Sequence, residues 1–391
     1  MSVTAAAGFE AAGIACGIKD GGVPDLALVA TADRRPVTAA GVFTTNLATA
    51  APVQVTREHL RDGRAAAVIL NSGNANAATG EAGRRDARRM CELTAHELGC
   101  APEDVLVCST GLIGYPLPME PIEAGIPKLV AALGSDAAAG QAAADAILTT
   151  DTVRKEALET IEIGDGRVAQ LGGMAKGAAM LSPAMATMLA VVTTNLAVER
   201  DPAQKMLANA VDTSFNRLSI DGARSTNDTV LLLATGSVEA DLRAGASALG
   251  HVCTTLSSLM ANDAEGKTKV ALIFVQGART PDDATLAARA VANSQLVQCS
   301  LNGGDPYWGR VLSELGASGA RFDPEKVTIS YHGVVVCRNG IAADHDADAL
   351  AHVMQLPTVE IQCDLGAGTS HTWVTTTDLS HAYIDENRGT S

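Results

Sequence analysis

Aromatic residues are scarce in this sequence, where they make up 3% of 391 positions. Apolar residues nevertheless account for 47%, so we expect a large core built mainly from Ala, Val, Leu and Met. Cysteine pairs of the CxxC type are absent as well, and the eight cysteines are scattered along the chain. That distribution is typical of reduced thiols in a cytoplasmic protein.

Positive charge is also in short supply. The chain has 29 basic against 44 acidic residues, a formal net charge of −15. Such a balance opposes binding to nucleic-acid phosphates and to anionic membrane surfaces. No apolar run is long enough to cross a bilayer, and residues 1–7 lack the basic and apolar regions of an export signal. We therefore expect a cytoplasmic protein with neither nucleic acid nor membrane as partner.

The motifs of several common cofactor and metal sites are missing. The sequence contains no Walker loop, no GxGxxG loop and no GxSxG nucleophile elbow. The eight histidines are dispersed, and His345, which stands between two aspartates, lies in an acidic stretch that favours solvation over metal binding. We predict neither a metal nor a tightly held cofactor.

Strand-like and helix-like segments are intermixed along the chain, which predicts an α/β fold. We expect strands at 26–32, 38–44, 66–70, 105–108, 229–233 and 270–275, and hairpins over 160–171 and 327–338. We expect helices at 81–98, which ends before Gly99, at 136–148, 201–212 and 242–260, and at 284–292, where Thr280 and Pro281 give the signature of a helix start. The predicted boundary separates a larger lobe, residues 1–278, from a smaller C-terminal α/β lobe, residues 279–391.

One hydroxyl residue, Thr187, stands among small and apolar neighbours, downstream of a glycine-rich turn that contains Lys176. If the backbone breaks between Ala186 and Thr187, the threonine becomes an N-terminus. Its freed α-amine, with an ordinary pKa of about 8, can then take the proton of its own hydroxyl and make the oxygen a nucleophile. On the residues alone, a buried strand or helix over 185–196 that merely contains Thr187 is the simpler interpretation.

Polar residues gather at other places after apolar runs. The segment Cys108 to Gly114 can expose backbone N–H groups that hold an oxyanion, or it forms an ordinary glycine turn. Asn71 to Asn76 carries three amides, which favours a loop braced by Asn side chains. The run Ser219 to Asp228 lines a pocket or turns the chain. Glu265 can bind a substrate ammonium group or the Thr187 amine, unless it is a solvated loop residue.

Taken together, these segments resemble the ornithine acetyltransferase family, whose members move the acetyl group of N-acetylornithine to glutamate in arginine biosynthesis. The resemblance spans essentially the whole chain and rests on six motifs in order. They are NSGNANAATG (71–80), STGLIG (109–114), TTDT (149–152), AKGAAMLSPAMATML (175–189), STNDTV (225–230) and DPYWGR (305–310). With these motifs in place, Thr187 is interpreted as the nucleophile.

The resemblance implies an autoproteolytic Thr N-nucleophile fold, with helices packed on stacked β-sheets, as in the family and in self-cleaving aminopeptidases. Cleavage between Ala186 and Thr187 gives an α chain, 1–186, and a β chain from 187. The family places the oxyanion hole at the Thr110 hydroxyl and the Gly111 N–H. The substrate contacts that it implies are Thr149 or Thr150, between which the motif does not decide, and Lys176, Thr187, Glu265, Asn387 and Ser391.

The implied reaction is a ping-pong transfer through an acetyl-Thr187 intermediate, with N-acetylornithine and glutamate as substrates and no cofactor. Acetyl-CoA as a second donor, which would make the enzyme bifunctional, stays open, as does service in a specialised pathway. The α and β chains are expected to associate as a heterotetramer of two of each. The alternatives are an aminopeptidase or amidohydrolase of the same self-cleaving fold, and a catalytically silent binding protein.

Overall fold

The computed structural model describes residues 3–164, 166–180 and 188–389 of the chain. Contacts between Cα atoms divide it into two units. The first holds the residues up to Asn216 together with Ala223–Met260, and the second holds Arg217–Gly222 and the chain from Ala261 onward. The sequence placed a boundary at residue 278 instead. The two positions differ by one strand, β11 (Val270–Ala278), which pairs with strands of the second unit on both sides.

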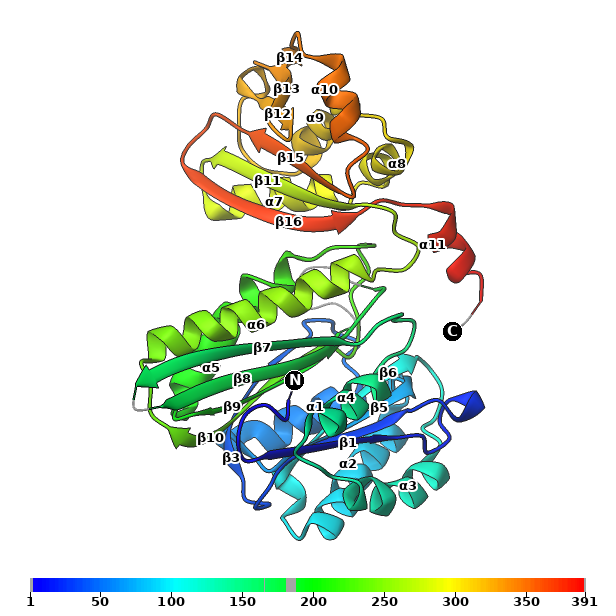
Figure 1. Cartoon of the computed structure of the whole chain (residues 1–391). Coiled ribbons are helices and arrows are strands. Elements are labelled where there is room, and N and C mark those ends of the chain that lie inside the picture. The colour runs from blue at the N-terminus through cyan, green and yellow to red at the C-terminus, as the bar shows by residue number, and fades with distance from the viewer. Residues whose placement is uncertain (1–2, 165, 181–187, 390–391) are drawn as a thin grey trace. The chain divides into compact units, whose positions relative to one another are not determined.

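The first unit contains two sheets (Figure 1). The four-stranded sheet has the order β1-β2-β5-β6 and the six-stranded sheet the order β4-β3-β10-β9-β8-β7. The strands of the smaller sheet are β1 (Phe9–Ile14), β2 (Leu26–Thr31), β5 (Ala67–Asn74) and β6 (Val105–Leu112). Those of the larger sheet are β3 (Val37–Phe43), β4 (Arg64–Ala65), β7 (Lys155–Gly164), β8 (Arg167–Lys176), β9 (Leu189–Leu196) and β10 (Thr229–Val238).

Helices and sheets of this unit form stacked layers. The inner faces of the two sheets share one core cluster, in which Val29 and Val68 of the smaller sheet meet Val191 and Leu231 of the larger. The helices of the unit are α1 (Ala51–His59), α2 (Gly80–Leu98), α3 (Met119–Ala131), α4 (Ala137–Ala146), α5 (Arg200–Asp212) and α6 (Leu242–Asn262). Helices α1 to α3 cover the outer face of the smaller sheet, while α4 joins the core between the sheets. The expected fold of helices on stacked sheets is thus confirmed.

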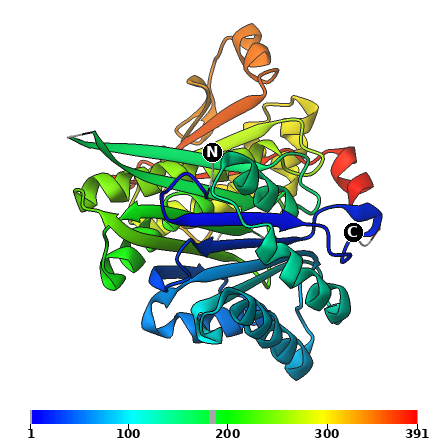
Figure 2. The same ribbon diagram turned by 60° about the horizontal axis from the view of Figure 1, so that its bottom comes forward.

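Local sequence signals explain several of these elements. Helix α2 ends at Gly99, whose φ of 75° lets it cap the helix in the left-handed conformation. Helix α4 begins after Asp136, whose carboxylate accepts the N–H of Ala139. Strands β7 and β8 form an antiparallel hairpin, as the sequence predicted, but these strands extend much further than expected. Figure 2 shows this green hairpin projecting beyond the other strands of its sheet.

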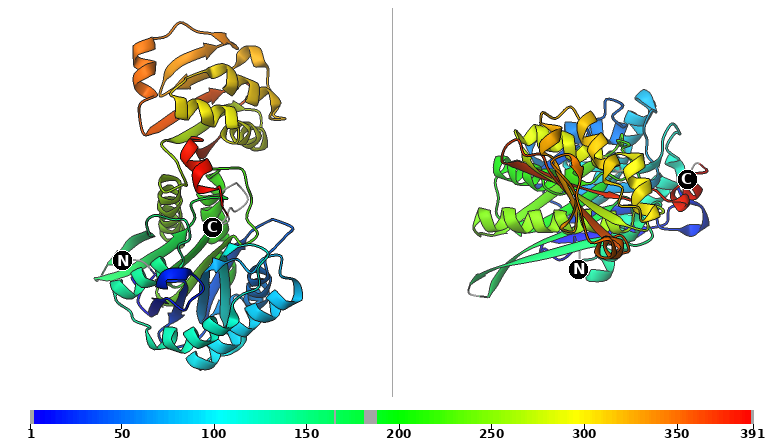
Figure 3. Two further views of the ribbon diagram at one scale, coloured as in Figure 1. Left: turned by 90° about the vertical axis from the view of Figure 1, so that its right-hand side faces the viewer. Right: turned by 90° about the horizontal axis from the view of Figure 1, so that it is seen from above.

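The second unit is a six-stranded sheet with helices packed against it (Figure 3). Its strand order is β14-β13-β12-β15-β11-β16. The further strands are β12 (Thr328–Tyr331), β13 (Val334–Arg338), β14 (Ile341–Ala342), β15 (Thr358–Asp364) and β16 (Ser370–Thr377). The helices are α7 (Pro281–Ala292), α8 (Gln295–Gly303), α9 (Trp308–Ala317), α10 (Ala347–Val353) and α11 (His381–Glu386). Helix α7 begins as predicted, because the Thr280 hydroxyl accepts the N–H of Asp283 and Pro281 opens the first turn.

Within the described ranges, no helix combines the length and the apolar character that crossing a membrane requires.

Candidate active site

Strand pairing aligns two of the sequence motifs at one end of the smaller sheet. Strands β5 and β6 run parallel, with Ser72 opposite Thr110 and Gly73 opposite Gly111. Gly111 has a φ of +127°, and a Cβ at this position would lie 2.3 Å from the carbonyl carbon of Gly73. Only glycine therefore fits at residue 111. The sequence interpretation ended β5 before Asn71, whereas the strand continues through Asn74.

The amides of that motif brace the backbone, as the sequence favoured. The Nδ2 group of Asn71 donates to the Asn74 carbonyl, and Asn74 Oδ1 accepts the N–H of Asn76. Asn76 Nδ2 in turn donates to the carbonyl of Gly83 in α2. These bonds hold the end of β5 and thereby the neighbouring Gly111.

Asn71 Oδ1, Ser109 Oγ and the Thr110 hydroxyl are buried polar atoms of this arrangement that have no hydrogen-bond partner among the described residues. Thr110 is 1% exposed. A buried hydroxyl without a partner costs free energy, so it marks a place where a ligand oxygen can bind. Thr110 and Gly111 also line a small pocket whose wall includes Met180, the last described residue before 188.

The STND motif packs directly against this segment. The side-chain amide of Asn227 donates to the carbonyl oxygens of Ala75 and Ser109, at 2.6 and 2.8 Å. The next residue, Asp228, accepts the N–H of Met188 at 2.9 Å through Oδ1. Burial raises the pKa of Asp228 well above its ordinary value, and the Met188 hydrogen bond and the charge of Lys176 only partly oppose this effect.

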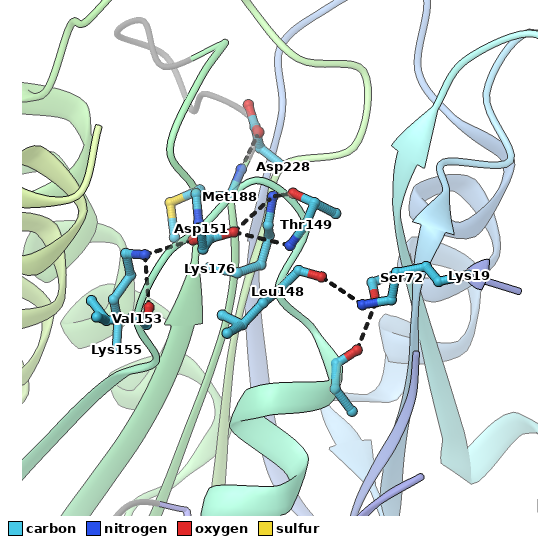
Figure 4. Close-up of polar contacts among 12 residues, drawn as sticks. Lys19, Ser72, Leu148, Thr149, Asp151, Val153, Lys155, Lys176, Met188 and Asp228 are labelled. Atoms are coloured by element: carbon cyan, nitrogen blue, oxygen red, sulfur yellow. Dashed lines mark hydrogen bonds and ion pairs between the residues drawn. The ribbon is translucent and has the colours of Figure 1, made fainter. Parts of the chain in front are cut away.

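A second polar cluster surrounds Asp151 (Figure 4). The Lys176 ammonium lies 2.6 Å from the Thr149 hydroxyl and 3.6 Å from Asp151, and Lys155 lies 2.6 Å from Asp151. The backbone N–H groups of Thr149 and Gly177 also donate to the Asp151 carboxylate. Burial alone would raise the pKa of Asp151, but the two lysines outweigh burial and lower it to about 2.

Two buried lysines thus share one carboxylate. Their side chains are 3% and 0% exposed. A buried ammonium group such as that of Lys176 favours an anionic ligand such as a carboxylate.

Lys19 adds a further positive charge beside this cluster. Its ammonium donates to the carbonyl of Leu148, the residue before Thr149, and its aliphatic stem lies against Gly73. Burial lowers the pKa of Lys19, and the nearby charge of Lys176 acts in the same direction. Sequence reasoning missed Lys19, because more than a hundred positions separate it from its partner.

The pairing of β9 with its two neighbouring strands brings Lys176 and Thr229 to the start of β9. Lys176 in β8 lies opposite Leu189, and Leu189 lies opposite Thr229 in β10. Thr187, two positions before Leu189, lies outside the described residues, as do Ala186 and Ser391. The described residues on either side of the expected cleavage point are Met180 and Met188.

Two of the expected substrate contacts belong to the second unit. Glu265 is 8% exposed and accepts a hydrogen bond from the Asn387 side chain at 2.7 Å. Gly266, with a φ of +61°, allows α11 to pack here, because a Cβ would lie 2.1 Å from the backbone nitrogen of Tyr383. The structure therefore brings Glu265 and Asn387 together.

The two threonines between which the motif did not decide, Thr149 and Thr150, have different surroundings in the structure. The Thr149 hydroxyl contacts Lys176, whereas Thr150 is exposed. Asp151, Lys155 and Asp228 were not identified as site residues from sequence. The available signal was the position of Asp151 in the TTDT motif and of Asp228 in the STND motif, whereas Lys155 lies outside both motifs.

No group of three or more His, Cys, Asp or Glu side chains that could hold a metal is found in the described part of the chain.

Comparison with known proteins places the chain clearly. The model of the ArgJ family matches residues 10–389. The arginine biosynthesis bifunctional protein ArgJ of Thermobifida fusca (strain YX) is 44% identical over 389 residues, 99% of either chain. The protein of the same name from Mycobacterium tuberculosis (strain H37Rv) is 44% identical over 404 residues, 99% of this chain and 96% of its own.

A solved structure, ornithine acetyltransferase from Mycobacterium tuberculosis complexed with ornithine, shares 44% identity over 46% of this chain and 94% of its own, with a TM-score of 0.42. The full-length matches define the protein as an acetyltransferase of arginine biosynthesis. The chain belongs to the ArgJ family.

Proposed function

We propose that the chain cleaves itself between Ala186 and Thr187 and then carries the acetyl group of N-acetylornithine to glutamate on the Thr187 oxygen. The observation that carries this proposal is that Asp228 and Lys176 lie at the start of β9, while Asn227, next to Asp228, bonds to Ser109, next to Thr110. The family model matches residues 10–389, and the proposed nucleophile, Thr187, comes two positions before Leu189 in the sequence. A nucleophile at residue 187 would need these groups close to the start of β9.

Cleavage starts when the Thr187 hydroxyl oxygen attacks the carbonyl carbon of Ala186. The C–N bond breaks, the hydroxyl proton ends on the Thr187 nitrogen, and an ester joins the two residues. Water then hydrolyses this ester, which leaves a carboxylate on Ala186 and a free α-amine and hydroxyl on Thr187. The net change is the hydrolysis of one peptide bond, and it creates nucleophile and base on one residue.

Acetyl transfer follows in two balanced halves. The Thr187 α-amine takes the hydroxyl proton while Oγ1 attacks the acetyl carbonyl of N-acetylornithine. The Thr110 hydroxyl and the Gly111 N–H stabilise the oxyanion, and the proton passes to the departing amine of ornithine. The uncharged amine of glutamate then attacks the acetyl ester and loses a proton, Oγ1 regains one, and N-acetylglutamate leaves.

Substrate recognition follows the charges of the two clusters. Both substrates carry an α-carboxylate, which we place against Lys176 and the Thr149 hydroxyl, the threonine in contact with that lysine. On the basis of the family resemblance, Glu265 and Asn387 stay proposed contacts of the ornithine side-chain ammonium, and the burial of the Glu265 carboxylate favours a cationic partner. Ser391 remains a proposed contact on the basis of the family alone.

The bifunctional name of the relatives supports acetyl-CoA as a second acetyl donor. We also propose that the α and β chains stay together in a heterotetramer of two of each. All eight cysteines are free thiols, which supports a cytoplasmic location.

The test combines mass spectrometry with an acetyl-transfer assay. The expected result is two chains that sum to the full mass plus one water, a β chain that begins at Thr187, and an acetyl group on that chain after incubation with N-acetylornithine. Thr187→Ala should remain uncut and inactive. An uncut protein that still transfers acetyl groups would refute the proposal. Release of free acetate without any need for glutamate would instead favour a hydrolase of the same fold.

A further inference from the structure

Met188 is held at both of its backbone polar groups. Its N–H donates to Asp228 Oδ1 at 2.9 Å, and its carbonyl oxygen accepts the N–H of Thr229 at 3.1 Å. Asp228 and Thr229 are consecutive residues, so one dipeptide makes both hydrogen bonds to Met188, the first described residue after the expected cleavage point. Figure 4 shows the bond to Asp228. The first of these bonds is made by a side chain. It therefore depends on the identity of residue 228, whereas the second does not.

The Asp228 carboxyl is itself firmly placed. The residue is fully buried, and its backbone carbonyl accepts the N–H of Thr44. Its neighbour Asn227 anchors the same loop to the backbone of Ser109, next to the proposed oxyanion hole. Because the loop is fixed at these points, Oδ1 presents a rigid acceptor to Met188.

The second carboxyl oxygen is unusual. Oδ2 of Asp228 is buried and has no hydrogen bond of ordinary geometry within the described ranges of the chain, although the Ser225 side chain lies close enough to lower the pKa of the carboxyl. A core aspartate normally satisfies both oxygens, because an unpartnered buried acceptor is costly.

We propose that Asp228 is a positioning residue for both reactions at Thr187, which it orients by holding the peptide group between Thr187 and Met188 through Oδ1. This inference rests on the proposed function. The N–H of Met188 belongs to the planar peptide group that begins at the Thr187 carbonyl carbon. Fixing that plane limits where the attached Cα, and with it the amine and hydroxyl of Thr187, can lie. Displacement of a reacting group by about 1 Å can reduce a rate about 100-fold.

The raised pKa of Asp228 agrees with this role. A charged carboxylate beside the new α-amine would stabilise the ammonium form and oppose proton acceptance from the hydroxyl. A neutral carboxyl still accepts the Met188 N–H without that effect. The residue thus orients the backbone without competing for the base.

The experiment compares Asp228→Asn with Asp228→Ala. Asn keeps the acceptor for Met188, and its amide nitrogen takes the place of Oδ2. Asn195→Ala is the matched control, because it removes a buried side chain that bonds backbone at the opposite end of β9. For each purified variant, the fraction cut before Thr187 is followed over time, and kcat and KM are measured on the cut protein.

We expect Asp228→Ala to slow cleavage and lower kcat at least about 10-fold while KM stays within about twofold, because misorientation affects the reaction more than binding. Asp228→Asn should restore both rates to within about threefold of the wild type, since it keeps the acceptor. Asn195→Ala should cut and turn over normally, whatever it loses in thermal stability.

Two outcomes overturn the inference. One is normal cleavage and kcat in Asp228→Ala. The other is an Asp228→Asn protein as impaired as Asp228→Ala, which would mean that the acid proton and not the acceptor is needed. If the Asp228→Ala protein does not fold, the cleavage rate and kcat of Asp228→Asn decide between the two interpretations. A wild-type chain that is never cut refutes the proposed function instead.

Discussion

The ammonium of Lys176 donates a hydrogen bond to the hydroxyl of Thr149 over 2.6 Å, and both groups border the buried carboxylate of Asp151. Lys155 contacts the same carboxylate and donates a hydrogen bond to the carbonyl of Val153. The two lysines therefore share an electrostatic partner and differ in what else they touch. Because of this difference, variants of the two lysines can distinguish a contribution to substrate binding from a contribution to the stability of the fold.

Replacing Lys176 by Met should raise KM for both N-acetylornithine and glutamate, because each has an α-carboxylate. Loss of a buried charged partner costs at least about 2 kcal/mol, which corresponds to about a 30-fold rise in KM. Steady-state kinetics with either substrate varied would measure it.

Lys155→Met is the matched control. It breaks a fully buried ion pair and should lower the free energy of unfolding by roughly 3 kcal/mol while leaving KM within about twofold, a factor that is under 0.5 kcal/mol. Urea unfolding gives the first quantity and the same kinetic assay the second. Equal effects of the two variants on KM would contradict our placement of the substrate carboxylate.

Gly111 and Gly114 offer a second matched pair, since both have positive φ in the segment after β6 begins. A Cβ at Gly111 would collide with the backbone of Gly73, whereas none of the surrounding atoms lies within 4 Å of one at Gly114. Gly114→Ala should therefore cost only the conformational strain of about 1 kcal/mol. Gly111→Ala must displace a strand, so we expect loss of acetyl transfer and a much lower melting temperature. A Gly111→Ala enzyme with normal activity would show that residue 111 does not shape the oxyanion hole.

Much of the fold could be predicted from local signals. Gly99 and the Thr280-Pro281 pair mark helix ends by their own conformational preferences, so α2 and α7 were located closely. Helix α3 was missed, because Pro127 in its interior argues against a helix. Here tertiary packing of Ile122 and Leu129 outweighs the local preference.

The candidate site was only partly visible in the sequence. The motifs that carry the family resemblance include Thr110 and Lys176. They did not indicate that Asp228 faces Met188, since that contact depends on the parallel pairing of β9 with β10. The TTDT motif also did not indicate which of its four side chains is buried. The side chain of Asp151 is buried because Lys155 and Lys176, at the paired ends of the neighbouring strands β7 and β8, converge on it.

Acid should weaken the first unit through Asp151. Its pKa in the folded chain is lowered to about 2, below the ordinary value, so the stabilisation is complete above about pH 4 and is lost as the pH falls toward 2. The contribution is roughly 2 kcal/mol near neutral pH. Urea unfolding of the wild type at pH 7, 4 and 3 should show this loss. Asp151→Asn should be less stable at pH 7 and show a smaller further loss in acid; parallel pH profiles would contradict the assignment.

Glu265→Gln tests the second cluster by charge alone, because Gln can keep the hydrogen bond from Asn387 while losing the negative charge. We expect KM for N-acetylornithine to rise about 10-fold or more, since a buried charge-assisted contact is worth at least about 1.4 kcal/mol. Glutamate has an anionic side chain, so its KM should stay constant or fall. Measuring both constants in one preparation provides an internal control for folding. A rise in both by the same factor would mean that Glu265 does not contact the ornithine ammonium, and that its bond to Asn387 serves only to hold α11.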